Sequence, residues 1–142
     1  MGVFLNKMRT LILSIVCVLF ISCTTKFQND ITNNNTEIVL ERINNSSLKK
    51  LNMKQGMGLS LLHTAVIDGK IEIVKALINR KVDLNMVSNG LTPLHIAVMD
   101  NNTILVKILI EAGANKEIKY KNLNAYDLAE INQNNEILQL LK

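Results

Sequence analysis

Apolar and polar residues from position 59 onward follow the spacing of short helices. In the clearest stretch, Leu94, Ala97 and Val98 fall on one face of a helix, and a second apolar stripe runs from Ile104 to Leu109. The polar residues 100–102 separate the two stripes and predict a turn. Each stripe is too short to form a stable helix alone in water, so the pattern predicts pairs of helices that stack on neighbouring pairs.

This helix pair recurs along the chain with an offset of 32 residues. Leu59–Asp68 aligns with Leu91–Asp100, and the match continues through the second apolar stripe of each copy. A third copy begins near Asn122. Repetition at a fixed period of this length is typical of solenoids, in which each unit contacts only its neighbours.

The second copy carries the boundary residues that such a helix pair requires. Thr92 is a good N-cap, and Pro93 suits the first helical position. Gly113 follows the second helix, where a left-handed residue often ends a helix. The first copy has Lys81 at this position, and a non-glycine residue in the left-handed region costs about 1 kcal/mol.

These features resemble the ankyrin repeat, most closely in the strings Gly90–Val98 and Ile104–Asn115. The resemblance implies an all-α solenoid of helix-turn-helix units joined by short hairpin loops. The first copy departs from the family pattern at Leu61, where proline is usual, and at Lys81, where glycine is usual. Residues 36–54 form either a degenerate cap repeat or one irregular helix pair. We expect a domain over 36–142, with an N-terminal cap at 36–57, repeat 1 at 58–89, repeat 2 at 90–121 and a C-terminal cap repeat at 122–142.

The first residues have the pattern of a targeting segment. A short basic region precedes the apolar run Leu11–Ile21, which is shorter than the roughly 20 residues that a membrane-spanning helix needs. The run ends at Ser22-Cys23, which resembles the cleavage site of bacterial lipoproteins, although Phe20 replaces the usual leucine. The resemblance implies a signal peptide at residues 1–22 and acylation of Cys23. An ordinary secretory signal that is cut elsewhere, or an uncleaved signal anchor, is the alternative.

The segment after this cysteine predicts a spacer. Cys17 would be removed with the signal, so Cys23 would be the only cysteine of the mature chain and no internal disulfide could form. Residues 23–35 are polar and rich in asparagine, which indicates an unstructured tether. We therefore expect a lipid-anchored protein of the bacterial cell envelope, on the periplasmic face or the cell surface.

Charge and chemistry exclude several function classes. Basic residues outnumber acidic ones by 16 to 12, and two of the basic residues lie in the targeting segment, so no nucleic-acid partner is expected. His63 and His95 occupy equivalent positions in successive copies, and the family resemblance implies a structural role for them. No paired cysteines, phosphate-binding loop or catalytic motif is present. We therefore expect no cofactor, no metal and no enzymatic activity.

The family resemblance implies a protein-protein interaction module whose partner is not identified by the sequence. Ankyrin proteins generally bind through their hairpin tips and the exposed side of their inner helices. An alternative function is a periplasmic inhibitor or immunity-type protein that blocks one toxic or enzymatic partner. Mapped onto this chain, the expected partner-binding residues are Ile67, Asp68, Met86, Val87, Ser88, Asn89, Leu91, Met99, Asp100, Tyr120, Lys121, Leu123 and Ile131.

Overall fold

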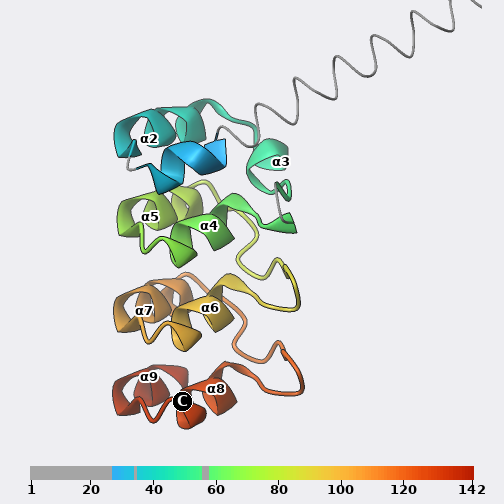
Figure 1. Ribbon diagram of the computed structural model, residues 1–142, viewed down its shortest axis with the longest axis vertical. Helices are drawn as coiled ribbons and strands as arrows, with labels where there is room; N and C mark the ends of the chain where they lie inside the picture. Colours follow the sequence, from blue (N-terminus) through green and yellow to red (C-terminus); the bar gives the residue numbers. More distant parts are fainter. Residues whose placement is uncertain (1–26, 34, 56–57) are drawn as a thin grey trace, which may run out of the picture.

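The computed structural model describes residues 27–33, 35–55 and 58–142, which form a stack of helix pairs (Figure 1). A helix at residues 27–32 precedes the other elements. The remaining helices are α2 (Thr36–Asn45), α3 (Leu48–Leu51), α4 (Leu61–Ile67), α5 (Ile71–Asn79), α6 (Pro93–Met99), α7 (Thr103–Glu111), α8 (Ala125–Ile131) and α9 (Asn135–Leu141). Within these described ranges the only β-type pairing is two isolated bridges. The expected all-α solenoid is confirmed.

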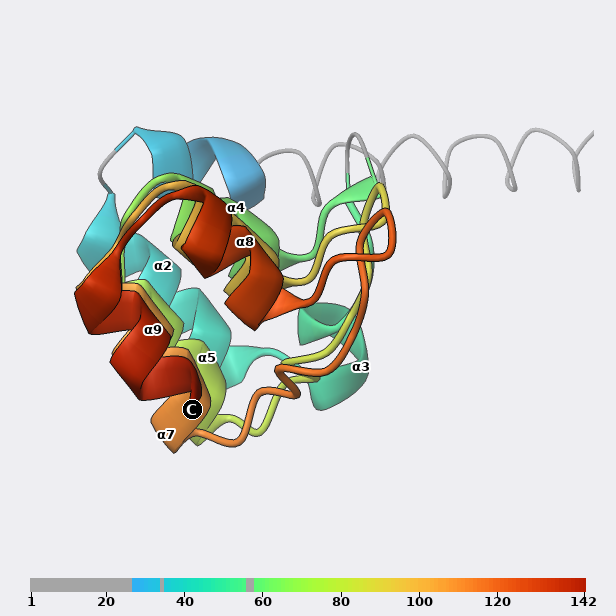
Figure 2. The same cartoon turned by 90° about the horizontal axis from the view of Figure 1, so that it is seen from below.

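The helices form two layers that run the length of the stack. The inner layer contains α4, α6 and α8, and the outer layer contains α2, α5, α7 and α9. Viewed along the stack, the pairs α4–α5, α6–α7 and α8–α9 superimpose closely, and the loops between them project to one side (Figure 2). This arrangement follows from the repeat, because identical spacing of caps and turns gives each pair the same shape.

Each inner helix begins with a side-chain cap at the same repeat position. Ser60, Thr92 and Asn124 accept a hydrogen bond from the backbone N–H three residues later. These caps satisfy donors that the helix itself cannot, which is worth about 1 kcal/mol each. In the last repeat the carboxylate of Asp127 also accepts from the Asn124 N–H at 2.8 Å, which completes a reciprocal capping box.

Left-handed residues end the helices at fixed positions. Lys81 has a φ of 59° and Gly113 a φ of 93°, so the lysine does occupy the left-handed position that the sequence predicts. The loops that project from the stack are two-residue hairpins. Asn89 and Gly90 both have positive φ, and Ser88 and Leu91 exchange backbone hydrogen bonds of 2.8 and 2.9 Å. These features define a type I′ turn, for which Asn-Gly is the preferred sequence.

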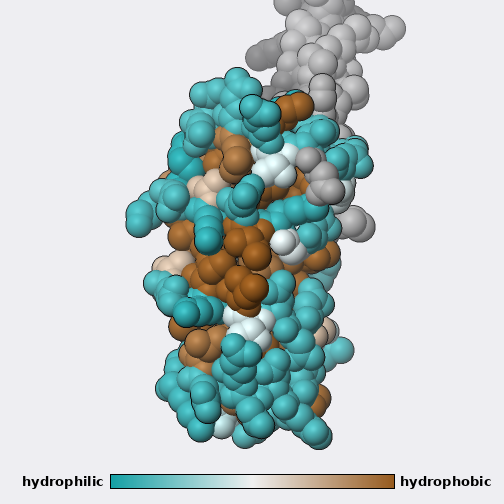
Figure 3. Space-filling view, turned by 90° about the vertical axis from the view of Figure 1, so that its left-hand side faces the viewer, coloured by the Kyte–Doolittle hydropathy of each residue, from teal (hydrophilic) through white to brown (hydrophobic). Residues whose placement is uncertain are grey.

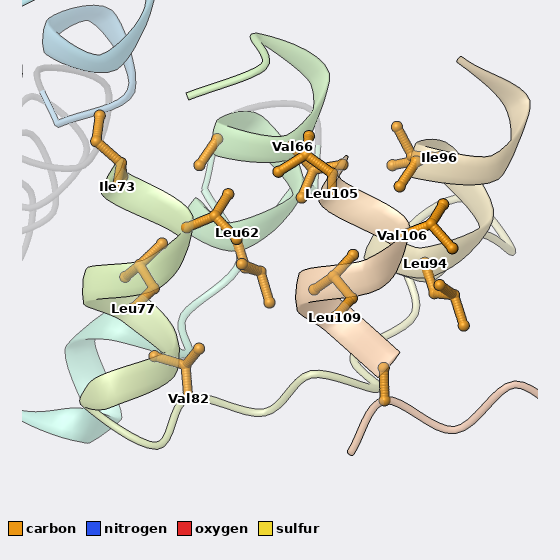
Figure 4. Packing of buried hydrophobic residues seen from close by; sticks show 14 of the residues in the cluster. Leu62, Val66, Ile73, Leu77, Val82, Leu94, Ile96, Leu105, Val106 and Leu109 are labelled. Atoms are coloured by element: carbon orange, nitrogen blue, oxygen red, sulfur yellow. The ribbon is translucent and has the colours of Figure 1, made fainter. Parts of the chain in front are cut away.

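The core lies between the two layers and between successive pairs. Leu62 and Val66 of α4 and Ile73 and Leu77 of α5 all belong to this core and are at most 2 % exposed (Figure 4). Leu105 and the other buried residues of α7 continue this packing in the next pair. Complete burial of such a side chain contributes about 1.5–3 kcal/mol, so stability comes from stacking rather than from any single helix.

The N-terminal boundary of the domain differs from the expectation. Residues 23–35 were expected to be an unstructured tether, but 27–32 are helical, and Phe27 and Ile31 are 3 % and 0 % exposed within the core. These two residues are four positions apart, so they lie on one helical face and bury together. Residues 1–26, which include the expected signal peptide and Cys23, lie outside the described residues.

The N-terminal cap is correspondingly shifted from its expected range of 36–57. Helix 27–32 and α2 form the first pair, because α2 packs against α5 in the outer layer. The short α3 is an additional turn on the hairpin side of the stack and not the second helix of the pair (Figure 2). The Arg80 guanidinium donates to the carbonyls of Asn44 and Ser46 at 2.8 and 2.7 Å and also contacts that of Ile43, so it caps the end of α2.

Candidate protein-binding surface

The last residues of α4, α6 and α8 are large apolar residues that are exposed to solvent. Ile67, Met99 and Ile131 end α4, α6 and α8, and their exposed fractions are 48, 47 and 63 %. They occupy the same position in three successive repeats, so they form a row along the stack. The caps at the opposite ends of these helices fix that position, and a repeated apolar row on a surface is typical of an interface.

A groove of about 350 Å³ lies between two of these residues. Its walls come from the ends of α4 and α6 and from the hairpin at 88–91. Its lining consists of Leu59, Ile67, Ser88, Asn89, Leu91, Ile96, Met99 and Asp100. On the side of the molecule where inner helices turn into outer helices, hydrophobic surface gathers midway along the stack, and hydrophilic residues predominate toward both ends (Figure 3).

The two histidines lie behind this surface and connect neighbouring parts of the stack. His63 is fully buried, with its Nδ1 2.7 Å from Ser60 Oγ and its Nε2 3.1 Å from the Leu91 carbonyl of the following hairpin. The carbonyl can only accept, so Nε2 carries the proton and Nδ1 accepts from the serine hydroxyl. His63 therefore ties α4 to the hairpin that forms one wall of the groove.

His95 makes the equivalent contacts to the N-cap residue of its own helix, Thr92, but not the hydrogen bond to the following hairpin. Its Nδ1 accepts from the Thr92 N–H at 3.2 Å and lies 2.7 Å from Thr92 Oγ1, while its buried Nε2 has no hydrogen-bond partner among the described residues. Burial lowers the pKa of both histidines, and for His63 the Leu91 carbonyl at Nε2 opposes the shift. Both rings are therefore neutral near pH 7 and act as structural hydrogen-bonding groups.

The family model for ankyrin repeats in three copies matches residues 28–120 and again residues 62–142. The chain belongs to the ankyrin-repeat family. A search of the curated proteins found no match. The matched region starts within helix 27–32, in agreement with the packing of that helix as part of the first ankyrin repeat. Ankyrin repeats are typically non-enzymatic modules for protein-protein interaction, so the family indicates a protein partner.

Six of the residues expected to bind a partner line the groove between α4 and α6. They are Ile67, Ser88, Asn89, Leu91, Met99 and Asp100. Ser88 is only 3 % exposed, and its Oγ donates to the Gly58 carbonyl at 2.6 Å, so it holds two hairpin loops together and offers little surface to a partner.

The other expected residues lie outside this groove. Tyr120 is half-buried, with its ring over Gly90 and 6.5 Å from the His95 ring, so it packs one hairpin against the preceding one. The Lys121 ammonium lies 5.1 Å from the Tyr120 ring centroid. The remaining members are either exposed or half-buried: Asp68, Met86, Val87, Leu123 and Ile131.

Sequence reasoning missed two residues of the groove, Leu59 and Ile96. Leu59 is the repeat equivalent of Leu91, so the 32-residue offset was the signal that could have found it. Ile96 lies one helical turn before Met99 and therefore on the same face of α6. In the described part of the chain, no group of three or more His, Cys, Asp or Glu side chains is placed to hold a metal ion.

Proposed function

We propose that this chain is a protein-binding module tethered to a membrane of the bacterial cell envelope, and that its partner binds in the groove between α4 and α6. The observation that carries the binding half is the row formed by Ile67, Met99 and Ile131. A solenoid whose only task was to fold would gain nothing by keeping a large apolar residue exposed at the same position in three successive repeats.

The groove favours a partner that inserts an apolar side chain between Ile67 and Met99. Complete burial of a side chain of this size contributes about 1.5–3 kcal/mol, enough to act as an anchor residue. Asn89 and Asp100 are exposed at the same groove, and their side chains can bond to the polar groups of a partner. An apolar centre with a polar rim is the usual anatomy of a protein interface.

Substitution of Met99 tests the binding half of the proposal. Met99→Glu places a charge in the groove, and we expect partner capture by crosslinking in intact cells to fall about tenfold to hundredfold. Ile38→Glu is the matched control, because Ile38 is 46 % exposed against 47 % for Met99 but lies on α2, away from the groove. Equal capture by the wild type and Met99→Glu would reject the groove as the binding site.

The anchoring half rests on the targeting segment and on Cys23. Among the residues that the structure describes, no helix has the length and apolarity needed to cross a membrane. Metabolic labelling with palmitate should mark the wild-type chain and leave Cys23→Ala unlabelled. Equal labelling of the two, or labelling of neither, would refute acylation at this cysteine while leaving the binding proposal intact.

The proposal assigns no catalysis to the chain. His63 and His95 are at most 1 % exposed, and neither lines the groove, so no substrate in the groove could reach a titratable ring. A module that blocks a single toxic or enzymatic partner would use the same surface. Capture of one protein at equal stoichiometry, with toxicity on deletion of this chain, would identify that narrower function.

A further inference from the structure

The folded domain begins close to the cysteine that we propose as the membrane anchor. Phe27 and Ile31 are buried in the core, and Gln28 Nε2 donates to Thr64 Oγ1 at 2.8 Å, so helix 27–32 is fixed against α4. The four residue steps from Cys23 to Phe27 span at most about 14 Å even when fully extended. An acyl chain on Cys23 would therefore hold the end of the stack that bears α2 and α3 beside the lipid headgroups (Figure 1).

The stretch of sequence that includes α3 is basic. No acidic residue occurs between Glu41 and Asp68, whereas the stretch contains the basic residues Arg42, Lys49, Lys50 and Lys54. Arg42 forms an ion pair with Asp30, so its charge is compensated. Lys49 and Lys54 are exposed, and both belong to α3 or to the loop that follows it.

The helix α3 holds Lys49 next to an exposed apolar side chain. Leu51 is 1 % exposed and attaches the turn to the core, and Ser47 Oγ caps it by accepting from the Lys50 N–H at 3.3 Å. Leu48, by contrast, is 43 % exposed and directly precedes Lys49. An apolar residue among lysines is the composition of segments that bind at the surface of anionic membranes.

We propose that the α3 patch, defined as Leu48, Lys49 and Lys54, binds the surface of an anionic phospholipid bilayer and sets the orientation of the solenoid on the membrane. This inference rests on the proposed acylation of Cys23. Each lysine near an anionic surface strengthens binding only about fivefold, so a patch of this size needs an anchor that keeps it close to the bilayer.

The chain has no tryptophan, so Leu48→Trp introduces a single fluorophore into the α3 patch. The full-length acylated protein is reconstituted into vesicles of brominated phosphatidylcholine, with or without phosphatidylglycerol, and the indole emission is recorded. Ile131→Trp is the matched control, because Ile131 is an exposed apolar residue in α8 at the opposite end of the stack. Flotation of the vesicles in the same samples shows whether the chain is anchored.

We expect the Leu48→Trp indole to be quenched and blue-shifted in vesicles that contain phosphatidylglycerol, and the Ile131→Trp indole to be unaffected. Adding Lys49→Glu and Lys54→Glu should lower the ratio of docked to undocked protein by about 25-fold or more. The same charge change at exposed lysines elsewhere, Lys75→Glu with Lys119→Glu, should leave the ratio unchanged.

Two results would overturn the inference while the anchor stands. One is an unquenched Leu48→Trp indole on a chain that floats with the vesicles, and the other is equal quenching with and without phosphatidylglycerol. A chain that fails to float with the vesicles and takes up no palmitate would refute the anchor itself, and the docking of the α3 patch would fall with it. Flotation therefore separates failure of the patch from failure of the proposed function.

Discussion

Replacement of Gly90 by alanine probes the contact between the two hairpins. Gly90 has a φ of 83°, and a Cβ built on it would lie 3.0 Å from Tyr120 Cδ2 and 3.2 Å from Cε2, closer than nearly all such contacts in proteins. Alanine at this position would therefore meet two separate penalties. One is the left-handed backbone, and the other is displacement of a ring that also packs near His95.

Two other glycines separate these penalties. Gly69 and Gly113 have φ values of 63° and 93°, on either side of the Gly90 value, and a Cβ on either would meet nothing within 4 Å. Left-handed alanine costs about 1–2 kcal/mol, and alanine recovers about 0.4–1 kcal/mol by restricting the unfolded chain, so each control should lose about 1 kcal/mol. Gly90→Ala should lose a further ~1–3 kcal/mol, the usual cost of overpacking.

Urea denaturation followed by circular dichroism measures these free energies of unfolding. In the Tyr120→Ala background the ring is absent, so the loss caused by Gly90→Ala should fall to that of the two controls. If Gly90→Ala is no more destabilising than Gly113→Ala in the wild-type background, the Tyr120 ring does not pack on this hairpin. The structural role assigned to Tyr120 would then be wrong, and the side chain would be available to a partner.

Three further predictions concern the histidines, the end of α2 and the first helix. Because burial lowers the pKa of His63 and His95, the unfolded state takes up protons more readily than the folded state. The stability that the two neutral histidines contribute should therefore be fully present above the ordinary pKa of 6.5 and fall as the pH drops below it. Urea midpoints on either side of this pH measure the effect, and glutamine at both positions should flatten the pH dependence. Arg80→Ala removes charged hydrogen bonds to α2 and should cost about 1.5–3 kcal/mol, with amide exchange rising in α2 before α6; a uniform rise would contradict the capping role. Ile31→Ala should cost about 2–5 kcal/mol, whereas alanine at the exposed Thr32 should change stability by less than about 0.5 kcal/mol. Equal effects of the two variants in thermal denaturation would show that helix 27–32 is not part of the domain.

The repeat made most of the fold predictable from sequence, because one offset assigned the helices, caps and turns of three units together. Even the atypical Lys81 adopts the left-handed conformation that its place in the repeat requires. The pair formed by helix 27–32 and α2 was not predicted as such. Helix 27–32 contributes only Phe27 and Ile31 to the core, within a run of asparagine and other polar residues. Two apolar residues do not establish a period, and that helix is held by packing against α4 rather than by its own sequence preference.

The candidate surface was predictable where it follows from the repeat and unpredictable where it depends on contacts between repeats. Met99 lies at the end of an inner helix, so its exposure follows from the helix boundary alone. Tyr120 was expected to bind a partner, and in the fold its half-buried ring also meets Gly90, which is 30 positions away in the sequence. Composition marks a tyrosine as suited to an interface, but only the distance between two hairpins shows that this ring also packs within the chain.

The one-dimensional packing of the repeats also determines how the protein would carry a mechanical load. Each described inner helix packs on its neighbour along the stack, α4 on α6 and α6 on α8. A pull between a membrane anchor before Phe27 and a partner seated between α4 and α6 would pass through the repeats on that side of the groove. The last repeat, with α8 and α9, would bear no tension, so it could shield the core of its neighbour even while the first repeats were strained.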